Sequence, residues 1–97
     1  MSSQLVPAAG RDPATIHAEL EGRGLAFHSW SNGPGYAYEW HDHGYHKTLI
    51  CLAGSIVFHT DGGDVSLSAG DVLELSPGTR HAATVGPDGV RCAEAAT

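Results

Sequence analysis

The chain has 97 residues, a length that supports one compact core and therefore a single domain. Hydrophobic residues make up 41% of it, which excludes a disordered chain, and thirteen glycines with five prolines predict many tight turns. The formal net charge is −6, and the five basic residues form no cluster, so the sequence offers no surface for a nucleic-acid backbone.

The sequence has no clear signal for a membrane span, for secretion or for a disulfide framework. No apolar run approaches the roughly 18 residues of a membrane span, and residues 1–13 lack the basic region and apolar stretch of a secretory signal. The two cysteines, Cys51 and Cys92, are too few for a disulfide framework and have no CxxC spacing, although the sequence leaves open whether they pair. We therefore expect a cytoplasmic protein that binds neither membranes nor nucleic acid.

The N-terminal quarter contains the one helix signal. Residues 1–11 have small side chains and no periodicity, and we expect them to form a flexible arm. Residues 12–24 begin with Asp12, which can accept the first free N–H groups of a helix, and Pro13, which suits the first helical position. Glycines follow at the far end, so this segment predicts a short helix near residues 13–22.

From residue 25 to residue 97 the pattern is all β. Eight short runs are separated by turn signals rich in Gly, Pro, Asn and Asp: LAFHSW, YAYEWH, TLICLA, SIVFHT, DVSL, DVLEL, RHAATV and VRCAEA. The segment from Ser76 to Thr79 has the proline and glycine of a type II turn. Short strands with no helix between them predict an antiparallel sandwich or barrel.

Histidines are the residues in this region that point to chemistry. Six of the seven lie between residues 25 and 97, where the strands are expected, and His41 and His43 flank Asp42. Side chains two positions apart on a strand face the same side, so these two imidazoles can reach one point. Neutral imidazole pairs are ligands for Zn, Fe, Ni or Cu. An isolated pair of this kind also fits two ordinary surface histidines.

The spacing around these histidines is informative. Gly35, His41, His43, Lys47 and Gly54 follow one another as G-x5-H-x-H-x3-K-x6-G. This pattern resembles the first motif of the cupin superfamily at every spacing, with Lys47 in place of the family's glutamate. A second stretch resembles the family's G-x5-P-x-G-x2-H-x3-N motif, with the proline one place late and Val85 in place of asparagine; its residues are Gly70, Pro77, Gly78 and His81. Two motifs in register are a specific signal.

The resemblance implies a small antiparallel, jelly-roll-like β-barrel with one short N-terminal helix, in one domain over residues 1–97. In cupins the two histidines and glutamate of the first motif and the histidine of the second bind a divalent metal. Carried over, this assigns His41, His43 and His81 to a divalent transition metal (Fe, Zn, Ni, Mn or Cu). Lys47 matches a ligand position with different chemistry, because an ammonium has no lone pair to donate.

Lys47 has two interpretations. In the first it replaces a lost ligand, and its ammonium reaches solvent past the mouth of the barrel. In the second, three histidines hold the metal and leave positions open, as in some oxygenases of the superfamily, and Lys47 is a catalytic residue. It would then neutralise an anionic substrate or act as an acid or base.

The other histidines, and the cysteine inside the first motif, are not assigned to the metal. Strand alternation points His46 away from the face of Lys47, toward the rim, unless a bulge turns it inward as a fourth ligand. We expect His59 and His17 to be structural. Cys51 is expected to be a buried thiol.

Three hypotheses for the function follow. The first is a metal-dependent oxygenase, isomerase or lyase that acts on a small polar or anionic molecule. The second is a non-catalytic module that binds a small ligand or a metal. The third is a metal-free scaffold whose histidines are relics and whose function lies in its oligomer surface. Since cupins commonly pair through short N-terminal segments, we also expect a homodimer.

Overall fold

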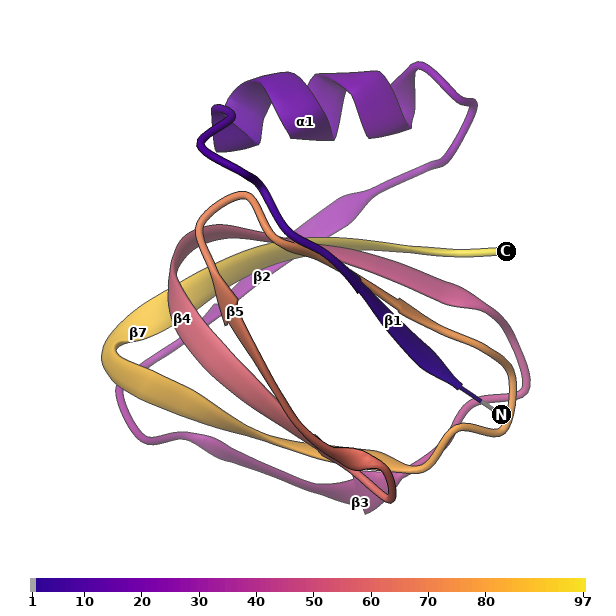
Figure 1. Cartoon of the computed structure of the whole chain (residues 1–97), viewed down its shortest axis with the longest axis vertical. Coiled ribbons are helices and arrows are strands. Elements are labelled where there is room, and N and C mark those ends of the chain that lie inside the picture. Colours follow the sequence, from indigo (N-terminus) through magenta and orange to yellow (C-terminus); the bar gives the residue numbers. More distant parts are fainter. Residues whose placement is uncertain (1) are drawn as a thin grey trace.

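A computed structural model describes residues 2–97, and Figure 1 shows its strands curving around a common interior. In this part of the chain, the elements in order are β1 (Ser3–Val6), α1 (Pro13–Glu21), β2 (His28–Asn32), β3 (Ala37–His41), β4 (Lys47–Thr60), β5 (Gly63–Ser68), β6 (Val72–Leu75) and β7 (His81–Ala96).

The strands form one antiparallel sheet. Its main path runs β1-β6-β4-β7-β2, while β3 pairs with β7 and β5 pairs with β4. Every pairing is antiparallel, which confirms the expected all-β, antiparallel architecture. Helix α1 confirms the helix signal: Asp12 Oδ2 accepts the Thr15 N–H at 3.1 Å, and Pro13 is the first helical residue. No helix in the described residues is long and apolar enough to cross a membrane.

Strands β4 and β7 are longer than the sequence predicts. Each one joins two of the expected short strands: β4 continues through Gly54, and within β7 residues 86–89, which have the composition of a turn, do not reverse the chain. Gly54 pairs with Val90 and Ile56 pairs with Val85, so residues 86–89 form an outward excursion opposite one residue of β4. Long-range pairing thus overrides the local turn signal, and the two bent strands run through both halves of the barrel.

The expected flexible arm is wrong for residues 3–6. These residues form β1, which pairs with β6 from Ser3 opposite Leu75 to Val6 opposite Val72. The Ser76 N–H also donates to the Ser2 carbonyl at 2.9 Å. Backbone pairing with an open sheet edge needs no side-chain periodicity, which is why the sequence did not reveal this strand.

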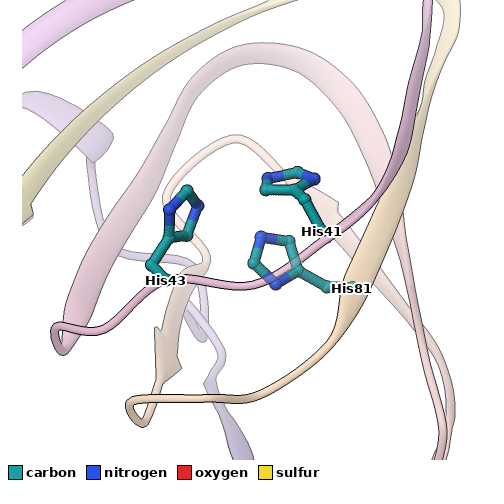
Figure 2. Close-up of side chains that lie close together, drawn as sticks. All are labelled: His41, His43 and His81. Atoms are coloured by element: carbon teal, nitrogen blue, oxygen red, sulfur yellow. The ribbon is translucent and has the colours of Figure 1, made fainter.

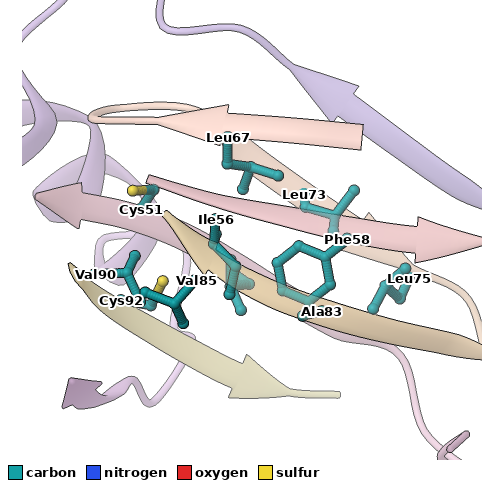
Figure 3. Packing of buried hydrophobic residues seen from close by; sticks show 11 residues of the cluster. Cys51, Ile56, Phe58, Leu67, Leu73, Leu75, Ala83, Val85, Val90 and Cys92 are labelled. Atoms are coloured by element: carbon teal, nitrogen blue, oxygen red, sulfur yellow. The ribbon is translucent and has the colours of Figure 1, made fainter. Parts of the chain in front are cut away.

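Alternation along the strands creates two apolar clusters. The inner cluster fills the barrel and comprises Leu49, Cys51, Ile56, Phe58, Leu67, Leu73, Leu75, Ala83, Val85, Val90 and Cys92 (Figure 3). On the outer face Ile50 and Ala93 point the other way, and Ile16 and Leu20 of α1 cover them. The helix therefore lies against the outside of the barrel, as Figure 1 shows.

Candidate metal centre

Pairing between distant strands brings the two motifs together. His41 ends β3 and His81 begins β7, and the two residues are register partners in the pairing of these strands. His43 follows two residues after His41, and its carbonyl accepts the Gly78 N–H at 2.8 Å. Gly78 has a φ of +78°, which a residue without a side chain adopts readily, so the expected turn closes toward the first motif.

All three predicted histidines converge. Figure 2 shows their rings gathered together, and their ligand atoms lie within 4.8 Å of one another. The ring centroids are 4.3 Å apart for His41 and His81, 4.8 Å for His41 and His43, and 5.3 Å for His43 and His81.

Backbone carbonyls set the tautomers of two of these rings. His41 Nδ1 lies 2.6 Å from the Glu39 carbonyl and His81 Nδ1 lies 2.9 Å from the Thr79 carbonyl. A carbonyl only accepts, so each Nδ1 carries the proton and leaves the Nε2 lone pair free in the neutral ring. Such a contact also orients an imidazole for metal binding.

Lys47 lies at the same site. Its side chain is only 10% exposed, so the ammonium does not reach solvent as the first interpretation required. Lys47 Nζ is 3.3 Å from His43 Nε2 and 3.3 Å from Glu94 Oε2. Because an ammonium can only donate, His43 Nε2 is the acceptor and its lone pair points into the cluster.

This arrangement agrees with the comparison with protein families. The cupin domain family matches residues 30–91, which is more than half of the chain. The chain belongs to the cupin family. No curated protein matches its sequence.

Solved structures show the same fold. A DUF861 family protein from Thermotoga maritima has a TM-score of 0.69 at 15% identity, over 99% of this cupin and 100% of that chain. A conserved protein with a double-stranded β-helix domain from Klebsiella pneumoniae has a TM-score of 0.66 at 26% identity, over 73% of this cupin and 61% of that chain. KdgF from a Halomonas species has a TM-score of 0.64 at 20% identity, over 74% of this cupin and 67% of that chain.

Burial keeps two of the histidines in this cupin neutral. Desolvation lowers the pKa of both His43 and His81, and the nearby Lys47 charge lowers the pKa of His43 further. For His81 the bond to the Thr79 carbonyl opposes this effect in part. At neutral pH the rings are therefore in the form that binds a metal ion.

Glu94 is the site residue that the sequence analysis missed. One carboxylate oxygen pairs with Lys47, and the other accepts the Trp30 Nε1–H at 2.7 Å. A signal was present, because alternation in the run VRCAEA places Glu94 on the inward face of β7 with Cys92. An acidic residue on an otherwise apolar inner face needs a partner, and Lys47 supplies it.

A cavity of about 230 Å³ adjoins the histidines. Its walls combine apolar and polar side chains: Trp30, Tyr38, Leu49, Phe58 and Ala83 with His41, Lys47, His81 and Glu94. A larger hollow of about 620 Å³ lies near the turn between β4 and β5 and is lined by none of the three histidines. The smaller cavity is thus the space that a ligand of the histidine cluster would occupy.

The remaining histidines of interest lie outside the cluster. His46 Nε2 contacts Glu74 Oε1 at 3.0 Å, so it faces away from the three converging rings. His59 lies between Asp64 and Thr84, at 2.8 and 2.9 Å, in a structural hydrogen-bond network. The ring of His17 packs edge-on against Phe27.

Proposed function

We propose that this cupin holds a divalent transition metal with His41, His43 and His81, and that it acts on a small anionic molecule as an oxygenase, isomerase or lyase. The convergence of three imidazoles beside a cavity carries this proposal. Three neutral nitrogen donors suit Fe, Zn, Ni, Mn or Cu. When bound, such an ion supplies a Lewis acid with open coordination positions.

Charge favours an anionic ligand. The Lys47 ammonium and the Glu94 carboxylate are 3.3 Å apart and compensate each other. Three imidazoles add no negative charge, so they leave the two positive charges of a bound divalent ion uncompensated in a site where only His81 is fully buried. A carboxylate or another oxygen anion would neutralise them, and the small cavity limits its size.

Lys47 is the proposed catalytic residue. It lines the cavity beside His41 and His81, and Glu94 holds its ammonium in place while Trp30 holds Glu94. From this position Lys47 can donate a hydrogen bond or a proton to a ligand oxygen in the cavity. The fixed carboxylate keeps the amine oriented, which lowers the entropy lost when it contacts a ligand.

One observation favours a second candidate, a non-catalytic binding module or a metal-free scaffold. The ammonium of Lys47 lies 3.3 Å from His43 Nε2, the nitrogen whose lone pair a metal would use. An ion that binds there has to displace this contact. A ligand with its own acceptor groups would instead meet the lysine and the histidines directly, without a metal.

Elemental analysis of the purified protein separates these candidates. We expect one divalent transition metal per chain, with His43→Ala losing most of it because one of three ligands is gone. The control is His17→Ala, whose ring packs against Phe27 and lies outside the cluster. Unchanged metal content in His43→Ala would end the metal proposal, and turnover of a small anionic substrate would separate an enzyme from a binding module.

A further inference from the structure

Cys51 and Cys92 face each other across the two longest strands. They are direct register partners in the antiparallel pairing of β4 with β7. The Cys51 N–H donates to the Asp71 carbonyl at 3.0 Å and its carbonyl accepts the Gly70 N–H at 2.7 Å, both on the side of β4 away from β7. The two cysteines therefore form a non-hydrogen-bonded cross-strand pair, in which Cα atoms are about 4.5 Å apart.

This geometry suits a disulfide. A Cα separation of about 4.5 Å falls at the short end of the range that disulfides span, and side chains of such pairs lie close on one face. Both cysteines are fully buried and belong to the inner apolar cluster, where Figure 3 places them at the same end. Both are free thiols in the structure.

The two thiols are not equivalent. The hydrogen bond between them lowers the pKa of Cys51 and raises the pKa of Cys92, and burial raises the pKa of Cys92 further. Cys51 is thus the thiol that ionises first, and the thiolate is the form that attacks a disulfide.

We propose that Cys51 and Cys92 form a redox-sensitive site, a cross-strand disulfide that closes and opens reversibly inside the barrel. The oxidant is a small disulfide such as oxidised glutathione. The Cys51 thiolate attacks one of its sulfurs and releases one thiolate; Cys92 then attacks Cys51 Sγ and releases the second. Two electrons pass from the protein to the small disulfide, and the two protein thiol protons go to the released thiolates.

Access requires a local opening, and β4 has a weak point in the right place. The register of β4 and β7 shifts between Cys51 and Ala53, where the regular ladder is interrupted. Opening at such an irregularity takes less free energy than global unfolding. Exchange should therefore be slow but complete. This proposal does not depend on the metal centre, whose histidines lie at other positions of the barrel.

Closure should stabilise the fold. The bond would join the two strands that carry most of the sheet and would close a loop of roughly 40 residues. For a domain of this size we expect the oxidised protein to melt roughly 10 °C higher than the reduced protein.

Thiol counting tests the proposal. The reduced full-length protein is incubated with oxidised glutathione and a metal chelator. It is then unfolded in denaturant at neutral pH with an alkylating agent present, and its mass is measured. We expect both thiols to become unreactive together, with a mass lower by two hydrogen atoms. Trypsin should then yield peptides 48–80 and 92–97 joined by a bond that a reductant breaks. Two alkylated thiols after prolonged oxidation, or a disulfide between chains only, would overturn it.

Matched variants assign the roles. In Cys92→Ala, Cys51 has no partner thiol and should keep one glutathione, whereas in Cys51→Ala the capture at Cys92 should be slower. Neither variant should gain thermal stability on oxidation. A stable glutathione adduct on the wild-type protein without the joined peptides would contradict the proposal, because it would show that Cys92 cannot reach Cys51.

Discussion

Lys47 stands where the family has a metal-binding glutamate, and a carboxylate is nevertheless present nearby, on the opposite strand. Glu94 of β7 meets Lys47 of β4 at 3.3 Å, and both side chains are largely buried. Removing one partner from a buried ion pair leaves an uncompensated charge, which typically costs more than the pair contributes. The two positions are therefore coupled, and a substitution at either one acts on both.

This coupling shapes the expected effect of Lys47→Glu. The variant adds a carboxylate ligand and removes a positive charge beside the ion, so metal affinity should rise at least about tenfold, or about 1.4 kcal/mol. Without metal, residue 47 and Glu94 would present two carboxylates to each other, and unfolding free energy should fall by about 2–4 kcal/mol. Competition with a chelator and urea unfolding measure the two effects.

The control for this prediction is Lys47→Glu combined with Glu94→Gln. It keeps the new ligand and removes the like-charge contact, so it should recover most of the stability and retain the tighter binding. If Lys47→Glu leaves metal affinity unchanged, residue 47 does not reach the metal.

Acid should destabilise the metal-free protein through His43 and His81, whose pKa values are lowered by desolvation. Desolvation lowers the pKa of His43 and His81 in the folded state, whereas the unfolded chain titrates near its ordinary pKa of about 6.5. Below that pH the unfolded chain binds more protons, so stability is full above about pH 6.5 and is lost as the pH falls through the folded-state pKa values.

Urea unfolding across this pH window, with a chelator present, checks this prediction. His81→Gln should flatten the dependence because a buried titrating ring is removed. His28→Gln, at a side chain that is 71% exposed, is the comparison variant, and its dependence should stay steeper than that of His81→Gln. Equal slopes for His81→Gln and wild type would contradict the assignment.

At the scale of elements, the pairing of β4 with β7 leaves very little space at Gly54. Gly54 has a φ of +74°, and a Cβ there would lie 2.0 Å from the Gly89 carbonyl oxygen. The backbone of residues 86–89 passes close to Gly54, the last residue of the first motif, and leaves no room there for a side chain. Its role is steric as well as conformational.

Gly54→Ala should therefore destabilise the protein strongly, by about 3 kcal/mol, because backbone strain and a clash with backbone atoms add. Gly35→Ala is the matched control: it has the same φ of +74° but nothing within 4 Å of the added Cβ. That variant should cost only about 1–2 kcal/mol. Thermal and urea unfolding compare the two, and equal losses would show that the close approach to Gly89 is unimportant.

For the whole molecule, the open edge of β1 gives the expected homodimer a structural basis. In the described part of the chain β1 has one neighbour, β6, and Leu5 and Val6 are exposed beside its unpaired edge. Unpaired edges with apolar side chains favour pairing with a second chain.

We expect light scattering at micromolar concentration to report a dimer, and Leu5→Lys to shift it toward a monomer by placing a charge at the edge. Trp40→Ser removes an exposed apolar side chain of β3, outside the edge of β1, and should leave the assembly unchanged. A wild-type monomer at this concentration would contradict the prediction.

The sequence by itself determined the all-β class, the helix and the three histidines. Turn residues, the cap at Asp12 and the spacing of His41 and His43 are local features, so a single stretch of chain records them. The second motif, at its expected distance from the first, added His81 to the predicted ligands. The pairing of β3 with β7 does bring His81 beside His41.

Only the tertiary structure decided the rest. The partner of Lys47 lies 47 positions away along the chain, and the pairing of β4 with β7 alone brings Glu94 to it. The same pairing sets Cys51 opposite Cys92 and turns an apparent loop at residues 86–89 into part of a strand. Contacts of this kind depend on how distant strands align, and that alignment is set by the burial of the whole core rather than by local composition.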